Sequence, residues 1–101
     1  MIHKIIDKDG FIYNLYESTI QHIRTDHCIE SPIELVRDII QNPDIIVESN
    51  WEKHTFLYYK KMTKGYKVVV ASKLSLKIKT AYFERKLKQG KILWINPKIK
   101  G

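Results

Sequence analysis

Three stretches that predict β-strands in the second half of the chain are joined by connections of only two or three residues, and this spacing constrains the fold more than any other feature. The stretches are residues 55–62, 66–73 and 76–85, and the connections are Thr63-Lys64-Gly65 and Leu74-Ser75. Connections this short can join only antiparallel neighbours. We therefore expect an antiparallel meander, which residues 92–95 extend as a further strand.

The stretch from Leu76 to Phe83 changes character along one face. In an extended chain Leu76, Ile78, Thr80 and Tyr82 point the same way, so this face begins apolar and ends in a hydroxyl and a phenol. The pattern suits a strand that runs from a core into the floor of a cleft. It equally suits a half-buried central strand in which Thr80 and Tyr82 only favour β structure.

The first half of the chain predicts a hairpin followed by two helices. Two apolar runs flank Asp7-Lys8-Asp9-Gly10, where Asp-Gly supplies the positive φ of a tight turn. A helix is expected from about Glu17, because Tyr16, Ile20, Ile23 and His27 recur at helical spacing, and Asn14 with Glu17 could cap it.

Ser31-Pro32-Ile33-Glu34 is the strongest local signal, since it combines a Ser N-cap, Pro at the first helical position and Glu at the third. The second helix should end near Gln41, because Asn42 precedes Pro43. Residues 45–47 form a short strand in this scheme. The predicted fold is α+β: one domain over residues 1–101, with an N-terminal hairpin and two helices packed on one face of an antiparallel sheet of about four strands.

Charge is distributed unevenly between the two halves. Residues 1–50 hold four Lys/Arg and nine Asp/Glu, whereas residues 51–101 hold fourteen and two. The basic residues alternate with aromatic ones, a mixture that suits phosphate contacts and base stacking. We expect a polyanionic partner, most simply RNA or DNA, although a solvated lysine-rich face or an acidic protein partner such as an inhibitor fits the same charge.

Cys28 is the single cysteine, so neither an internal disulfide nor a cysteine-based zinc site can form. We expect a reducing, cytoplasmic location, and no apolar run suggests a signal peptide or membrane anchor. None of the four histidines has the short spacing of a metal-ligand pair, so we expect no metal and no cofactor.

The remaining His, Arg, Lys, Thr and Tyr side chains are sufficient for cleaving RNA without a metal. Histidine can take the proton from the ribose 2′-hydroxyl or protonate the leaving oxygen, while cations and hydroxyls hold the phosphate. His22 and His27 are about 140° apart around an unbroken helix, so only one of them would face the sheet. We place His27 there, beside Arg24, and His22 one turn from Asp26, which either orients it or forms a surface pair with it.

The whole set of local motifs resembles the phage- and mobile-element-associated members of the Barnase/EndoU/colicin/RelE-like (BECR-fold) nuclease superfamily. The motifs are Asp9-Gly10-Phe11-Ile12, His22-Ile23 followed by His27, Asn42-Pro43-Asp44, Leu57-Tyr58-Tyr59-Lys60, Lys67-Val68-Val69-Val70, Thr80-Ala81-Tyr82-Phe83 and Leu93-Trp94. The resemblance implies a BECR-like fold and a metal-independent ribonuclease site. It implies catalytic roles for five residues, namely His22, His27, Lys60, Thr80 and Tyr82.

Further RNA or phosphate contacts are expected from Arg24, Tyr59, Lys73 and Arg85. Relatives commonly have Arg directly before the second histidine and Pro after it, whereas this chain has Asp26 and Cys28. The site is therefore poorer in positive charge, unless Arg24 or Lys60 compensates.

Three functions remain open from the sequence. The first is a small ribonuclease, as a toxin or phage effector, that leaves a 2′,3′-cyclic phosphate. The second is a non-catalytic RNA-binding module that uses the basic, aromatic sheet. The third is an interaction protein whose basic half docks on an acidic inhibitor or antitoxin.

Overall fold

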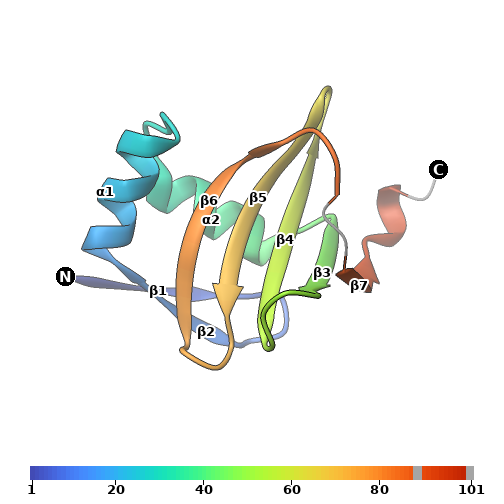
Figure 1. Cartoon of the computed structure of the whole chain (residues 1–101), viewed down its shortest axis with the longest axis horizontal. Helices are drawn as coiled ribbons and strands as arrows, with labels where there is room; N and C mark the ends of the chain where they lie inside the picture. The colour runs from blue at the N-terminus through green and yellow to red at the C-terminus, as the bar shows by residue number, and fades with distance from the viewer. Residues whose placement is uncertain (88–89, 100–101) are drawn as a thin grey trace.

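One mixed sheet of seven strands organises the computed structural model, which describes residues 1–87 and 90–99 (Figure 1). The strands are β1 (Ile2–Ile6), β2 (Ile12–Tyr16), β3 (Ile45–Ser49), β4 (Thr55–Met62), β5 (Gly65–Ser72), β6 (Lys77–Glu84) and β7 (Gly90–Ile95). The helices are α1 (Glu17–Asp26), α2 (Pro32–Gln41) and a final 3₁₀ turn, η1 (Pro97–Ile99). The sheet order is β1-β2-β6-β5-β4-β3-β7. No helix in the described part of the chain is long and apolar enough to cross a membrane.

The predicted meander is present in β4, β5 and β6, which pair antiparallel along their lengths. Gly65 begins β5 with φ +100°, and a Cβ there would lie 2.5 Å from the Glu84 carbonyl oxygen. The tight turn between β4 and β5 therefore requires glycine on two grounds, conformation and space.

The prediction of about four antiparallel strands was wrong in number and in pairing. β2 joins the sheet through a parallel bridge between Asn14 and Lys77, supported by a 2.8 Å bond from the Asn14 N–H to the Leu76 carbonyl. β7 pairs with β3 instead of extending the meander from β6. The free edge of β6 is occupied by β2 and by α1, which leaves the β3 edge for the last strand (Figure 1).

A buried polar network attaches the N-terminal hairpin to the meander. Gly10 has φ +89°, as the Asp-Gly turn requires, and Asp7 Oδ1 accepts the N–H groups of Asp9 and Phe11 at 2.9 and 2.8 Å. Asp7 Oδ2 accepts the Tyr58 hydroxyl at 3.2 Å, and the hydroxyls of Tyr58 and Tyr13 lie 2.8 Å apart. The buried carboxylate thus fixes both the turn and its position against β4.

Burial raises the pKa of Tyr13 to about 12, and the negative charge of Asp7 adds to the rise, while the hydrogen bond with Tyr58 opposes it. Burial likewise raises the pKa of Tyr58 well above its ordinary value of about 10. Both phenols therefore stay protonated in the folded protein at pH values where an exposed tyrosine ionises.

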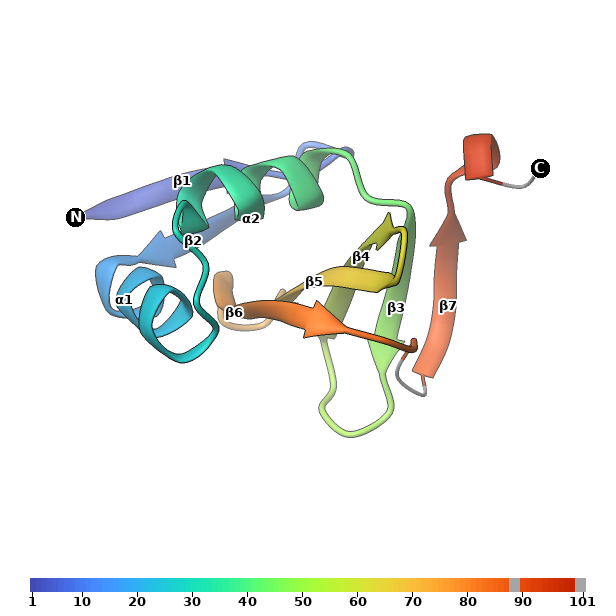
Figure 2. The same ribbon diagram turned by 90° about the horizontal axis from the view of Figure 1, so that it is seen from above.

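Figure 2 shows that α2 and the β1–β2 hairpin cover one face of β3–β6, while α1 lies at the β6 end. The larger core fills the space on this face and includes Ile20, Ile23, Val36, Ile39, Tyr58 and Ile78. A smaller core lies on the opposite face around Leu57, Tyr59 and Val68. The central strands are therefore apolar on both sides.

Both helices begin where predicted, but the predicted caps are absent. Tyr16 stands at the N-cap of α1 and Ser31 at that of α2, and neither side chain makes a capping hydrogen bond. Ser31 has ψ 71°, far from the extended value of most N-caps, so its hydroxyl is not directed at the first turn. The start of α2 is instead secured by Pro32 and by the buried residues that follow.

We predict that Tyr58→Phe lowers the free energy of unfolding by about 1–3 kcal/mol, because it leaves Asp7 and Tyr13 buried with a missing partner. Urea unfolding followed by circular dichroism measures the change. Tyr66→Phe is the control, since Tyr66 is only partly buried. Equal losses in the two variants would contradict a stabilising role for the network.

We also predict that stability falls in the alkaline range. Because folding raises the pKa of Tyr13 from about 10 to about 12, its contribution is complete below pH 10 and is lost as the pH rises from 10 through 12. The urea midpoint should fall less steeply over this range in Tyr13→Phe than in the wild type. Identical slopes would show that Tyr13 ionises normally in the folded protein.

Candidate functional site

The connection from β2 to α1 places the first helix beside β6. In the described part of the chain β2 forms a single ladder pair with β6, Asn14–Lys77, and α1 begins directly after β2 ends at Tyr16. The chain then runs along the rest of the β6 edge as a helix (Figures 1 and 2). Its C-terminal end therefore lies near the later residues of β6.

Three side chains named from the sequence come together at this end of α1. The rings of His22 and His27 have centroids 5.2 Å apart and are nearly perpendicular, at 83°. The ring of Tyr82 on β6 lies 5.8 Å from that of His27, tilted by 39°. Two imidazoles and a phenol thus form a continuous row from the helix to the sheet.

The angle of about 140° expected between the two histidines holds only for an unbroken helix, and α1 stops before His27. α1 ends at Asp26, and His27 is its C-cap with φ −115° and ψ 5°. Cys28 follows with φ +54° and turns the chain away. Because His27 has a non-helical backbone, its ring lies next to that of His22. In a continued helix the two side chains would point about 140° apart.

Asp26 holds His22 in a defined orientation. Its Oδ2 lies 2.8 Å from Nδ1 of His22 across one turn of α1, and the two side chains are 56% and 46% exposed. A neutral His22 that donates from Nδ1 keeps its Nε2 lone pair available as a proton acceptor. Asp26 is therefore a partner of the first histidine.

A β-bulge decides which way Thr80 and Tyr82 face. On β5 Val70 and Ala71 are consecutive, but their partners on β6 are Thr80 and Ile78, so Lys79 is an extra residue. Ile78 packs in the larger core, whereas Tyr82 packs against the smaller core on the opposite face. The predicted common face of Ile78, Thr80 and Tyr82 was therefore wrong.

Thr80 has an unusual environment. It pairs with Val70, next to the Val68–Tyr82 pair, and its Oγ1 is buried with no hydrogen-bond partner in the described part of the chain. A buried hydroxyl without a partner carries a desolvation cost. It lies two residues from Tyr82 on the same face of the strand.

The other residues named from the sequence lie elsewhere. Tyr59 is fully buried against Tyr66, with ring centroids 5.5 Å apart, so it offers no surface for base stacking. Lys73 lies over the rings of Phe11 and Phe56 at 5.0 and 4.8 Å. The expected stacking role of Tyr59 is thus corrected, whereas the phosphate contact expected from Lys73 stays a prediction.

Neither of the cations expected to replace the missing arginine is placed beside the histidines. Arg24 lines a hollow with Glu30 and Glu34 between the two helices. Lys60 donates to the Asn42 carbonyl at 2.8 Å, at the C-terminal end of α2 and on the helix-covered side of β4. Arg85 lines an open depression with Lys64 and Gly65 beyond the end of β6.

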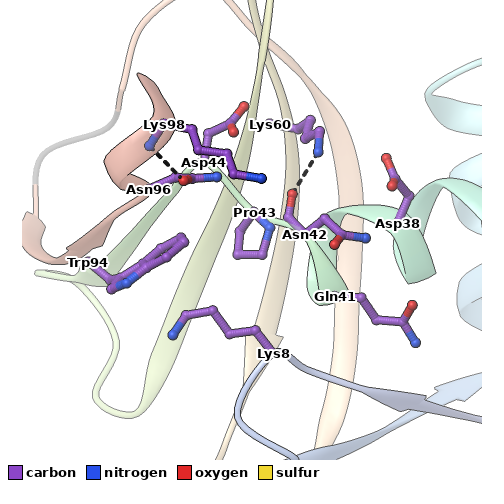
Figure 3. Close-up of a pocket in the computed structure, with 10 residues that line it drawn as sticks. All are labelled: Lys8, Asp38, Gln41, Asn42, Pro43, Asp44, Lys60, Trp94, Asn96 and Lys98. Carbon is purple, nitrogen blue, oxygen red and sulfur yellow. Dashed lines mark hydrogen bonds between the residues drawn. The ribbon is translucent and has the colours of Figure 1, made fainter. Parts of the chain in front are cut away.

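Lys60 lines a cavity of about 570 Å³ that it shares with Trp94, and none of the three clustered rings lines this cavity. Figure 3 shows the residues that line this cavity. In addition to Lys60 they include Lys8, Trp94, Asn96 and Lys98. Lys8, Asn96 and Lys98 had no signal in the sequence that linked them, because they come from distant segments without a common motif. Among the described residues, no three His, Cys, Asp or Glu side chains are grouped to hold a metal ion.

Residues 2–91 match a family model described as phage-Barnase-EndoU-ColicinE5/D-RelE like nuclease3. The match includes the whole of α1 and β6 and therefore all three clustered rings. No curated protein and no solved structure matches the chain.

We predict that neutral His22 carries its proton on Nδ1, because the Asp26 carboxylate oxygen lies 2.8 Å from that nitrogen and can accept a hydrogen bond from it. Nitrogen chemical shifts of the imidazole, measured by NMR at pH 8, distinguish the two tautomers. Asp26→Ala should move His22 toward the Nε2–H form, while Asp38→Ala, a change at another exposed helical aspartate, should not. A wild-type His22 already in the Nε2–H form would contradict the orienting contact.

Proposed function

The chain belongs to the phage-Barnase-EndoU-ColicinE5/D-RelE like nuclease family, and we propose that it is a ribonuclease that cleaves RNA by attack of the ribose 2′-hydroxyl on the adjacent phosphate. The observation that carries the proposal is the row of His22, His27 and Tyr82. Two imidazoles that lie within reach of one substrate can serve as the base and the acid of such a reaction.

The roles of the two histidines follow from their contacts. His22, oriented by Asp26, presents Nε2 and acts as the general base toward the 2′-hydroxyl. His27, in its protonated form, delivers a proton to the departing 5′-oxygen. A bond forms between the 2′-oxygen and phosphorus, and the bond from phosphorus to the 5′-oxygen breaks. The upstream product therefore ends in a 2′,3′-cyclic phosphate.

The hydroxyls of Thr80 and Tyr82 hold the phosphate in this scheme. Both lie on one face of β6, and a phosphate oxygen accepts hydrogen bonds from hydroxyl groups as negative charge develops. Because Thr80 Oγ1 is buried, β6 has to adjust before this hydroxyl reaches the phosphate, and the contact would then give it the partner that it lacks. Lys60 has no part in this step, since it lies in a separate cavity.

The positions of the aromatic and basic side chains favour the ribonuclease over a sheet that binds RNA without cutting it. Such a sheet needs exposed rings between cations, whereas Tyr59 is buried and Lys73 lies on two phenylalanine rings. RNA remains the proposed substrate. We also propose an acidic inhibitor or antitoxin as a partner for the basic half. A role as a toxin or phage effector in the cytoplasm is likewise a proposal.

We predict that His27→Ala and His22→Ala each lower the rate of RNA cleavage by about 10²- to 10⁴-fold, because each removes a proton-transfer group. An oligoribonucleotide labelled at its 5′ end, incubated at pH 7 in EDTA, gives the rate. The labelled product should carry a 2′,3′-cyclic phosphate, and a single 2′-deoxy substitution at the cut site should prevent cleavage there.

His54→Asn is the matched control, because His54 is exposed, lies in the loop before β4 and has φ +61°, which asparagine tolerates. Circular dichroism of all variants checks the fold. RNA that stays intact with the wild-type protein, or a His27→Ala variant that cleaves at the wild-type rate, would overturn the proposal.

A further inference from the structure

The cavity at the β7 end of the sheet is built from four separate parts of the chain. The β1–β2 turn provides Lys8, the end of α2 provides Gln41 and Asn42, β4 provides Lys60, and the C-terminal segment provides Trp94, Asn96 and Lys98 (Figure 3). Its volume of about 570 Å³ lies within the usual range for small-molecule sites.

Three lysine side chains give the cavity its positive character. Lys60 donates to the main-chain carbonyl of Asn42, and no carboxylate pairs with it or with Lys98 among the described residues. Lys8 pairs with the exposed Asp9 and lies 4.4 Å from the centre of the Trp94 ring. All three ammonium groups can therefore turn toward an anion without leaving a buried carboxylate unpaired.

Two carboxylates also line the cavity, but neither opposes the lysines directly. Asp44 is buried, and its Oδ2 accepts the main-chain N–H of Lys61 at 2.7 Å. Asp38 is exposed on the last turns of α2. In Figure 3 its carboxylate lies at the side of the cavity away from Trp94 and Lys98.

The uncharged lining fits more than a simple anion. The side-chain amides of Gln41, Asn42 and Asn96 each offer both a donor and an acceptor, and these pair with the edges of nucleobases. Trp94 adds a large planar surface. A nucleotide fits both parts of the lining. Its phosphate group would lie among the lysines, and its base would contact the amides and the indole.

This cavity is distinct from the histidine site. Lys60 shares the face of β4 that carries Tyr58, on the helix-covered side, whereas Tyr82 lies on the opposite face of the sheet. Trp94, Asn96 and Lys98 follow residue 91, where the match to the nuclease family ends. One wall of the cavity is therefore made by residues beyond the matched segment.

We propose that this cavity is a nucleotide-binding site that holds a nucleoside monophosphate group, with Lys8, Lys60 and Lys98 around the phosphate and Trp94 beside the base. The group can come from a free mononucleotide or from a nucleotide of an RNA strand. The site is separate from cleavage, so its test does not depend on catalysis.

Binding can be followed by the fluorescence of Trp94 in a His27→Ala, Trp51→Phe background, since Trp51 is 84% exposed and would otherwise contribute. Titration with adenosine 5′-monophosphate should quench the emission to saturation. Adenosine and inorganic phosphate, each carrying half of the ligand, should bind at least about tenfold more weakly. Lys98→Ala should weaken binding by about tenfold, because it removes one charged phosphate contact.

Lys77→Ala is the matched control, since Lys77 is an exposed lysine on β6, away from the cavity. Competition by a short RNA oligonucleotide would identify a strand nucleotide as the ligand, and failure to compete would identify a free nucleotide. Absence of quenching by the monophosphate, equal binding of phosphate alone, or equal losses in Lys98→Ala and Lys77→Ala would overturn the proposal. None of these results depends on whether the wild type cleaves RNA.

Discussion

The β-bulge at Lys79 is the constraint on which the candidate site depends. The extra residue lets one strand place Ile78 in the larger core and, two positions later, Thr80 on the opposite face. In a regular strand the two would share a face. Thr80 and Tyr82 would then lie under the helices among apolar side chains, with no route to a substrate. Because the bulge precedes both residues, the rest of β6 presents its hydroxyls on the side that His27 reaches.

The short pairing between β2 and β6 provides the other half of the site. A longer β2 would cover the edge of β6 and keep α1 away from it. Instead the strands separate after one bridge, and the following helix takes the vacant edge. The Asp7, Tyr58 and Tyr13 network fixes the hairpin from which this helix starts. A small two-stranded hairpin has little stability alone, so buried hydrogen bonds to β4 are a means of holding its position.

The sequence predicted elements better than it predicted their partners. β4, α1 and α2 began within a residue of their expected starts, because turn residues, Pro32 and helical spacing act locally. β7 pairs with β3 because that edge of the sheet is free. The free edge is a property of the whole sheet, so no local sequence pattern predicts it. The bulge has no signature either, since Lys79 fits the alternation of a regular strand. The missed bulge explains why Ile78 was placed with Tyr82, whereas the role of Lys60 came from the family resemblance and not from a strand pattern.

The carboxylate of Asp26, directly before His27, affects how the proposed chemistry must balance charge. A cation beside the second histidine would stabilise the developing negative charge on the phosphate directly. In this chain the same position carries a carboxylate that faces His22, while Arg24 and Lys60 lie toward other groups. The protonated His27 then has to supply positive charge as well as a proton. The two histidines are therefore unequal in the proposed mechanism: one is held in a fixed tautomer as the base, and the other must begin the reaction charged.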